Sequence, residues 1–336
     1  MKSTIRQSLA WGYYRSGHFL SRLQGKAVIL TYHRVLSEKE LSEQFVQPGM
    51  YVRDDVFEMQ MRFLREHFEI LSFSELLSLW KNKLWDKRTR YCVITFDDGW
   101  LDNYLYAYPI LKKYQIPATI FLPTGFIGTS EWFWPDRIGY LLARYVKASV
   151  QQPLDFLCDR YPLLKRARGD GVEQINSIIE TCKELPEEEI ERMIEEMSQE
   201  LGLDSPPGRI VMNWSEVEKM SASGVSFGSH SATHKILTTI STKDVENELK
   251  VSLKTLKREN VTAVPVFCYP NGNFTHTIAE QVKEAGYEAA VTVRFGFETQ
   301  KPANLFELKR IGVHNDITST VPLFSWHLSG MNHSLI

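Results

Sequence analysis

The sequence predicts an α/β fold, a parallel sheet or barrel with a helical insertion. Short apolar segments rich in β-branched residues alternate with longer segments whose apolar residues recur at helical spacing, and about seven such strand–helix units can be counted. The alternation stops near residue 129 and resumes near residue 210. With 336 residues, 43% of them hydrophobic, the chain can bury the core of one large domain with an insertion.

Residues 1–26 are predicted to form an amphipathic helix. Its apolar stripe, with arginines at the edges, comprises Ile5, Leu9, Tyr13, Phe19, Leu20 and Leu23. We favour the interpretation that the stripe packs against the rest of the protein, because most amphipathic helices in soluble proteins cover a core. The alternative is a peripheral contact with an anionic membrane surface, for which the rings of Trp11, Tyr13 and Tyr14 are suited.

The part of the chain at residues 27–128 holds the first strands of the predicted barrel. The strands are continuous apolar runs, which is typical of parallel strands buried on both faces. In order, the predicted elements are strand Ala27–Tyr32, a helix after Asp54 or Asp55, a helix at 74–80, strand Tyr91–Phe96, a helix at about 103–114 and strand Ala118–Leu122.

Residues 129–209 are predicted to form a helical insertion. Pro186, followed by glutamates, fits the first turn of a helix, where the helix dipole favours negative charge. We interpret this acidic run as a solvated helix face and not as a catalytic feature. A rigid turn at 205–208 (SPPG) ends the insertion.

After the insertion the alternation resumes, so residues 27–128 and 210–320 are predicted to form one barrel. Each of three helices leads to a strand, and a final strand follows. The helices lie at 214–221, 242–259 and 277–285, and the strands at 225–227, 264–269, 289–293 and 308–313.

Composition argues against several classes of protein. The net charge of −2 does not indicate the basic surface that nucleic-acid binding requires. The four cysteines, Cys92, Cys158, Cys182 and Cys268, form no CxxC pair, so neither a disulfide framework nor a cysteine-based zinc site is indicated. No segment has the apolar length of a secretory signal or a membrane span, so we expect a cytoplasmic protein, with contact at the inner membrane surface as the alternative. The oligomeric state is not indicated.

Two adjacent carboxylates follow a predicted strand, in the segment 95–99 (TFDDG). The C-terminal ends of the strands form the active face of a parallel β/α barrel, so Asp97 and Asp98 are expected at a catalytic site. One carboxylate can bind a cation whose field keeps the other ionised as a base. The alternative is an ordinary Asp-Gly turn.

A pair of histidines follows the first strand predicted after the insertion, in the segment 230–234 (HSATH). Imidazoles at this spacing can converge on one ion where the backbone is helical or tightly turned. Two histidines and one carboxylate leave open positions for water and a substrate oxygen, as a hydrolytic metal site requires. His230, His234 and one of the aspartates are therefore candidate metal ligands.

A third motif, 268–272 (CYPNG), ends a further predicted strand. Its turn can point backbone N–H groups at a developing oxyanion, although such turns are also common as purely structural features. Trp100, Tyr269 and Pro270 lie near strand ends and are candidate substrate contacts.

In this order, TFDDG, HSATH and YPNG resemble the motifs of the polysaccharide deacetylase family (carbohydrate esterase family four, the nodulation-type deacetylases). Residues 116–122 (IPATIFL) and 214–220 (WSEVEKM) are also similar to segments of that family, and the likeness covers residues 27–128 and 210–315. The resemblance implies a distorted (β/α)7 barrel, a divalent metal that is usually zinc, and removal of the acetyl group from an N-acetylated glycan or a lipid-linked amino sugar.

The resemblance also implies roles for individual residues. By motif position, Asp97 becomes the general base, and Asp98, His230 and His234 become the metal ligands. The backbone N–H of Asn271 would then help to hold the oxyanion. The aromatic rings of Trp100 and Tyr269 could stack on the sugar.

Two departures from the family pattern stand out. Cys268 occupies the place of an arginine that usually orients the catalytic aspartate, and Arg310 could replace that arginine. The family's Asp-Trp pair is not visible near residues 291–297.

Two histidines are candidates for the general acid that protonates the leaving amine. His33 ends an apolar strand, as the family's acid does, but lies early in the chain, where some biofilm-type members carry it as a circular permutation. His314, in the segment 312–316 (GVHND), has the usual chain position without the preceding apolar run. We favour His33.

Two other functions remain open. Another amide hydrolase on the same fold, such as a deformylase or a ureide-ring hydrolase, would keep the metal and change the substrate. A catalytically silent glycan-binding subunit would account for the missing arginine and Asp-Trp pair, but a silent site has no physical reason to keep the metal-binding residues.

Overall fold

The computed structural model describes residues 2–148, 155–203 and 206–331. The chain divides into two compact units: Met1–Ser37, Tyr51–Thr129 and Val211–Ile336 form the first, and Glu38–Met50 and Ser130–Ile210 form the second. The second unit thus contains most of the predicted insertion together with an earlier segment, Glu38–Met50, that the sequence analysis did not separate from the barrel.

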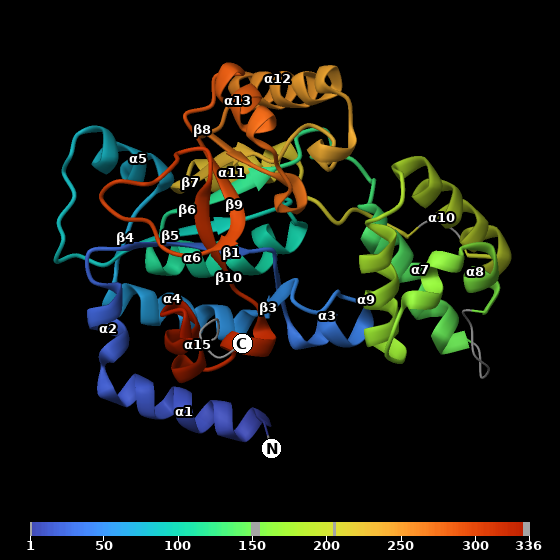
Figure 1. The fold of residues 1–336 in the computed structure, drawn as a ribbon, viewed down its shortest axis with the longest axis horizontal. Helices are drawn as coiled ribbons and strands as arrows, with labels where there is room; N and C mark the ends of the chain where they lie inside the picture. The colour runs from blue at the N-terminus through green and yellow to red at the C-terminus, as the bar shows by residue number, and fades with distance from the viewer. Residues whose placement is uncertain (1, 149–154, 204–205, 332–336) are drawn as a thin grey trace. The chain divides into compact units, whose positions relative to one another are not determined.

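The first unit is built on a closed parallel barrel (Figure 1). The sheet in the described chain runs in the order β1-β10-β9-β8-β7-β6-β5-β4, and a further parallel pairing of β1 with β5 closes it. The strands that complete the circle are β1 (Ala27–Tyr32), β5 (Tyr91–Phe96), β6 (Ala118–Leu122), β7 (Val225–Ser229), β8 (Ala263–Cys268), β9 (Ala289–Phe295) and β10 (Leu308–Gly312). These seven strands confirm the predicted (β/α)7 barrel.

Three short strands were not predicted. β4 (Glu69–Ile70) pairs with the first two residues of β5 and so extends the sheet beyond the circle. β2 (Arg34–Leu36) and β3 (Tyr51–Arg53) form a separate parallel pair. With two or three residues each, these strands carry too short a pattern to be distinguished from loops in the sequence.

The barrel strands are continuous apolar runs because both of their faces are buried. All six residues of β1 and of β5 are buried, and the two strands pair from Ala27↔Tyr91 to Tyr32↔Phe96. Successive residues of β1 belong in turn to two different apolar clusters, with Ile29 in one and Leu30 in the other. The side chains of β1 therefore alternate between two sides of the strand, although the sequence of the strand is apolar throughout.

Helices of the first unit pack around these strands (Figure 1). α5 and α11 each begin with a capping box, in which Ser72 and Asn213 accept hydrogen bonds from the backbone N–H three residues later. The helices are α4 (Asp54–His67), α5 (Phe73–Lys81), α6 (Tyr108–Tyr114), α11 (Trp214–Ser221), α12 (Thr242–Arg258), α13 (His276–Glu284), α14 (Asn315–Thr318) and α15 (Val321–Leu328). Shorter helical turns lie at Asn103–Ala107, Leu237–Thr239 and Pro270–Gly272.

The N-terminal segment forms two helices where one was predicted. α1 (Lys2–Ser16) and α2 (His18–Leu23) are separated by Gly17, whose φ of 69° lies in the left-handed region. The apolar stripe is divided accordingly. Leu23 is buried, whereas Ile5 and Leu9 are 56% and 51% exposed. On α1, Ala10 and Tyr13 make the contact with α15, and the Tyr13 ring meets Trp326 edge to face.

The second unit is helical and has its own apolar core. Its helices are α3 (Glu38–Glu43), α7 (Trp134–Ala148), α8 (Asp155–Arg160), a short helical turn at Pro162–Arg166, α9 (Gly171–Cys182) and α10 (Glu187–Leu201). Ile138, Ile179 and Met193 contribute to this core from three different helices. Pro186 lies immediately before α10, one position earlier than the first helical turn predicted for it, and glutamates occupy that turn as expected. No helix in the described ranges is long and apolar enough to span a bilayer.

Gly228 of β7 tests how tightly the barrel is packed. A Cβ at this position would lie 2.5 Å from a Phe121 ring carbon and 2.9 Å from the Val266 carbonyl oxygen. We expect Gly228→Ala to lower the free energy of unfolding by about 1–3 kcal/mol, the usual cost of overpacking a core. Gly312→Ala on β10 is the matched control, because no atom lies within 4 Å of its Cβ position. Equal urea midpoints for the two variants would contradict this account of the core.

Candidate active site

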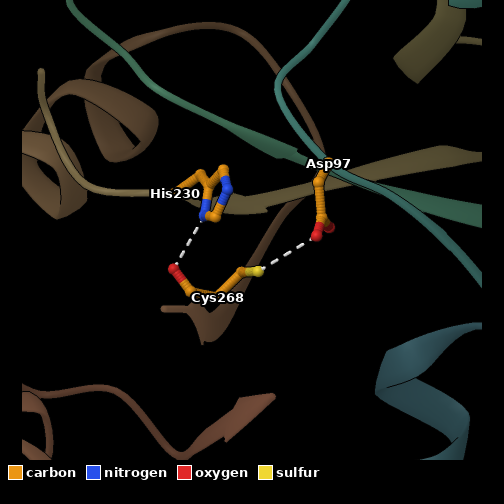
Figure 2. Close-up of side chains that lie close together, drawn as sticks. All are labelled: Asp97, His230 and Cys268. Carbon is orange, nitrogen blue, oxygen red and sulfur yellow. Dashed lines mark hydrogen bonds between the residues drawn. The ribbon is translucent and has the colours of Figure 1, made fainter. Parts of the chain in front are cut away.

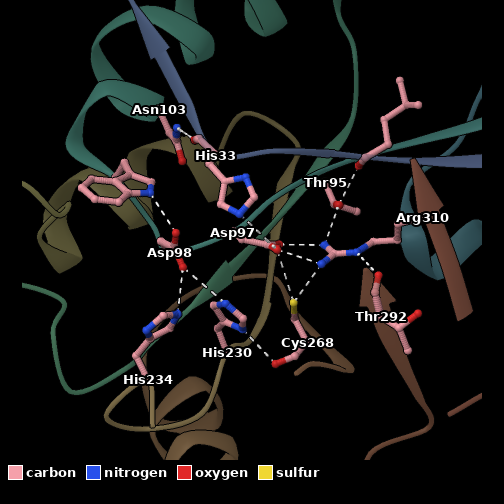
Figure 3. Close-up of polar contacts among 12 residues, drawn as sticks. His33, Thr95, Asp97, Asp98, Asn103, His230, His234, Cys268, Thr292 and Arg310 are labelled. Carbon is pink, nitrogen blue, oxygen red and sulfur yellow. Dashed lines mark hydrogen bonds and ion pairs between the residues drawn. The ribbon is translucent and has the colours of Figure 1, made fainter. Parts of the chain in front are cut away.

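The predicted motifs meet at the C-terminal ends of the barrel strands (Figure 3). His33 follows β1, Asp97 and Asp98 follow β5, and His230 follows β7. The register of β1 and β5, the two strands that close the barrel, explains why His33 lies beside Asp97. Tyr32 is paired with Phe96, so His33 and Asp97 come next on adjacent strands, and the Asp97 backbone N–H donates to the Tyr32 carbonyl oxygen at 3.0 Å.

Asp98, His230 and His234 converge in the manner of metal ligands. Asp98 Oδ1 lies 3.3 Å from His230 Nε2 and 3.1 Å from His234 Nε2. The three ligand atoms lie within 4.8 Å of one another. Asp98 and His234 both have a left-handed φ, 70° and 61°, which turns their side chains toward the common point.

The hydrogen bond of His230 leaves its other ring nitrogen available to bind a divalent ion together with Asp98 and His234. His230 Nδ1 lies 2.8 Å from the carbonyl oxygen of Cys268, which can only accept, so Nδ1 carries the proton. When the ring is neutral, its lone pair is therefore on Nε2, the atom that faces Asp98. One carboxylate oxygen and two imidazole nitrogens form a donor set suited to a zinc-type ion, with positions left for water and substrate.

A second group of donors, Asp97, His230 and Cys268, also lies close together (Figure 2). Both carboxylate oxygens of Asp97 already accept hydrogen bonds from Arg310. Burial raises the pKa of the Cys268 thiol above its usual value, which disfavours the thiolate that a metal needs. The group with Asp98 and His234 is therefore the better candidate metal site.

Arg310 makes a two-point ion pair with Asp97 inside the barrel. Nη1 donates to Oδ1 at 2.7 Å and Nη2 donates to Oδ2 at 2.8 Å, while Nε donates to the Thr292 carbonyl oxygen. Burial by itself would raise the pKa of Asp97, but the Arg310 guanidinium outweighs it and holds that pKa below its usual value. Asp97 is therefore ionised at neutral pH, as a general base must be.

His33, of the two histidines considered as acids, lies beside Asp97. Its Nε2 is 3.9 Å from Asp97 Oδ2. Burial lowers the pKa of His33, and the charges of Asp98 and Asp97 oppose this shift. The carboxylate nearest to His314 is instead that of Asp316, with 3.5 Å between Nδ1 and Oδ2.

The aromatic side chains predicted to contact a sugar are covered. Trp100 is 2% exposed, and its indole N–H donates to Asp98 Oδ2 at 3.0 Å. Tyr269 is 1% exposed, its hydroxyl donates to the Phe306 carbonyl oxygen, and its ring stacks on Phe274. Neither ring face is open for stacking, so the geometry does not support that role.

In the turn after β8, Asn271 and not Pro270 reaches the surface. Pro270 is buried, and Asn271, which is exposed, has a left-handed φ of 54°. The Asn271 side chain donates to Asn273 Oδ1 at 2.7 Å. The predicted use of the Asn271 backbone N–H for an oxyanion remains a prediction.

Glu248 on α12 was missed by the sequence analysis. Its carboxylate accepts hydrogen bonds from the backbone N–H groups of Ala232 and Thr233, both at 2.8 Å, and from the Thr233 hydroxyl. It thereby fixes the loop between His230 and His234. The available signal was an acidic residue beside Leu249 on the buried face of an amphipathic helix.

Comparison with known proteins finds deacetylases both by sequence and by fold. Residues 86–290 match the family model for polysaccharide deacetylase. A poly-beta-1,6-N-acetyl-D-glucosamine N-deacetylase from Staphylococcus aureus (strain MSSA476) is 34% identical over 125 residues, which cover 34% of this chain and 42% of that protein. The match thus spans less than half of the relative's length.

Solved structures share the fold at low sequence identity. Streptococcus pyogenes deacetylase PplD in complex with acetate has a TM-score of 0.56 at 20% identity, covering 88% of this chain and 95% of that one. IcaB from Ammonifex degensii has a TM-score of 0.56 at 17% identity, covering 90% and 97%.

The matched range, 86–290, includes Asp97 and the candidate metal ligands Asp98, His230 and His234, but neither His33 nor Arg310. His33 follows β1 and Arg310 lies on β10, and only the closure of the barrel brings them to Asp97. Because the family model matches more than half of the chain, the chain belongs to the polysaccharide deacetylase family.

Proposed function

We propose that this protein is a metal-dependent hydrolase that removes the N-acetyl group from an amino sugar in a glycan or glycan precursor, in polysaccharide or cell-envelope biosynthesis. The observation that carries the proposal is that two adjacent carboxylates have different partners. Asp98 faces two histidines, whereas Asp97 is paired with Arg310. The relative named as a poly-beta-1,6-N-acetyl-D-glucosamine N-deacetylase makes β-1,6-linked N-acetylglucosamine the first substrate to test.

In this proposal Asp98, His230 and His234 hold the metal, which we expect to be zinc. When bound, such an ion supplies Lewis-acid activation of the amide and of the attacking water. Asp97, kept ionised by Arg310, accepts a proton from that water.

The remaining groups act on the oxyanion and the leaving group. The backbone N–H of Asn271 donates to the oxyanion that develops on the acetyl carbonyl. His33 donates a proton to the departing sugar amine, which leaves poorly without one. The 3.9 Å between His33 Nε2 and Asp97 Oδ2 supports this, because acid and base must flank the same amide.

The alternatives differ in substrate or in activity. A deformylase or ureide-ring hydrolase would use the same residues on another amide. A silent glycan-binding subunit was considered partly because Cys268 replaces the family's arginine. Arg310 at 2.7 Å from Asp97 weakens that reason.

Acetate release should depend on the metal and on Asp97. With Zn²⁺, the protein should release acetate from β-1,6-linked N-acetylglucosamine oligomers, and a chelator should abolish the release. Asp97→Asn should lower kcat by at least ~100-fold while bound zinc is retained. Asp159→Asn, at an exposed aspartate of the second unit, is the control.

The products separate the alternatives. Formate from an N-formyl substrate without acetate from the oligomers would favour the deformylase alternative. Glycan binding with bound zinc and no hydrolysis of any amide would favour the silent subunit.

His33→Ala should remove the alkaline limb of the pH profile. Activity requires Asp97 ionised and His33 protonated, so kcat/KM should fall as the pH rises through the His33 pKa. His33→Ala should lower kcat, remove that limb and retain bound zinc, while His314→Ala should keep the wild-type profile. The reverse pattern in the two variants would make His314 the acid.

We also propose that α1 makes a peripheral contact with an anionic membrane surface, near a lipid-linked precursor. Ile5, Leu9 and Trp11 are more than half exposed on α1. Residues 1–37 contain lysines and arginines but no acidic residue. Exposed apolar side chains on a segment without acidic residues suit a negatively charged interface.

Vesicle sedimentation tests this contact. The full-length protein should bind anionic vesicles at low salt and be released by added salt, and Ile5→Ser with Leu9→Ser and Trp11→Ser should abolish binding without changing acetate release. Leu84→Ser with Val172→Ser removes exposed apolar side chains elsewhere and serves as the control. Full-length protein that ignores anionic vesicles at low salt would rule the contact out.

A further inference from the structure

We propose that Trp100 and Arg34 are positioning residues that orient the candidate metal ligand Asp98. The inference rests on the function proposed above, because it concerns the same metal site. It assigns a role to a buried ion pair and a covered indole that the chemistry itself does not use.

The two oxygens of Asp98 face different partners. Oδ1 lies 3.3 Å and 3.1 Å from the Nε2 atoms of His230 and His234. Oδ2 accepts the indole N–H of Trp100 at 3.0 Å. A carboxylate free to rotate could present either oxygen, and the indole hydrogen bond selects the orientation in which Oδ1 faces both histidines (Figure 3).

Trp100 is itself fixed on both sides. Its backbone forms an antiparallel bridge with Val211, and the preceding Gly99 carbonyl oxygen accepts from the Met212 N–H at 2.9 Å. The guanidinium of Arg34 lies over its ring, 4.6 Å from the centroid. The indole therefore has little freedom to tilt away from Asp98.

Arg34 is anchored by Asp102. Arg34 Nε donates to Asp102 Oδ2 at 2.8 Å, and the two side chains are 8% and 4% exposed. Asp102 Oδ1 accepts the Val35 N–H at 2.9 Å. A buried ion pair is a poor means of stabilising a fold, because the desolvation of both charges offsets their attraction. The ion pair can instead serve the site by holding the Arg34 guanidinium in a fixed position.

The same anchor reaches the candidate acid. The Asn103 side chain donates to the His33 carbonyl oxygen at 2.7 Å and to Asp102 Oδ1 at 3.3 Å. The segments that carry His33 and Asp98 are thus held by one buried polar cluster, formed by Arg34, Asp102 and Asn103.

Zinc affinity tests the indole hydrogen bond directly. Trp100→Phe should bind Zn²⁺ roughly 10–100-fold more weakly than wild type in competition with a chromophoric chelator, the usual effect of losing a partner of a metal ligand. Trp85→Phe is the matched control, because Trp85 is also buried and donates its indole N–H, there to the Gly25 carbonyl oxygen. It should keep wild-type affinity, and thermal melts of both variants should report any general loss of stability.

Arg34→Lys tests whether Arg34 acts through Trp100. Lysine keeps the charge but loses the planar group that covers the indole, so affinity should fall in the wild-type background. In a Trp100→Phe background the same change should have little further effect, since coupled residues are not additive. Additive losses, or wild-type affinity in Trp100→Phe, would overturn the inference. Absence of zinc binding in wild type, or full binding in His230→Ala, would instead overturn the proposed function on which the inference depends.

Discussion

The ion pair between Arg310 and Asp97 determines how the two adjacent aspartates differ. The guanidinium is 1% exposed and makes hydrogen bonds to both Asp97 oxygens, to the Thr292 carbonyl oxygen and to the Cys268 sulfur. With both oxygens occupied, Asp97 is held as an ionised group with a fixed direction. Asp98, one residue later and with a left-handed backbone, points to the histidines instead. Two identical side chains thus acquire different chemistry from their surroundings.

This arrangement depends on the closure of the barrel. Arg310 lies on β10 and His33 follows β1, whereas Asp97 follows β5. An open sheet in the same order would leave β1 and β5 far apart, and the β1–β5 pairing is what places His33 beside Asp97. Closure also puts the guanidinium in a buried environment, where its pairing with Asp97 is least screened by water. The fold is therefore a requirement of the site and not only a support for it.

The sequence predicted the parts of this protein whose signals are local. The strands at Ala27–Tyr32 and Tyr91–Phe96 are long apolar runs, and the aspartate and histidine motifs lie at or just after the ends of predicted strands. Arg310 could be named only as a candidate, because its partner is more than 200 residues away and the contact exists only in the closed barrel.

The sequence analysis failed where a feature depends on contacts between distant residues or on the backbone conformation of a single residue. Trp100 follows a strand end, where exposed and buried aromatic residues have the same local pattern, and its covered ring depends on Arg34. The break between α1 and α2 depends on the conformation of Gly17, which an uninterrupted helical periodicity conceals. The association of Glu38–Met50 with the second unit is a tertiary contact without a local pattern.

Backbone conformation shows how firmly the site is held before any ligand binds. Six non-glycine residues in the described ranges have a positive φ, and four of them, Asp98, Ser231, His234 and Asn271, belong to motifs at the strand ends. Such conformations cost on the order of 1–3 kcal/mol each and persist only where the surroundings determine them. Here Glu248 holds the histidine loop through two backbone N–H groups. The packed barrel and its buried hydrogen bonds therefore offset the strain, and the ligands can be in place without a rearrangement of the loops when an ion binds.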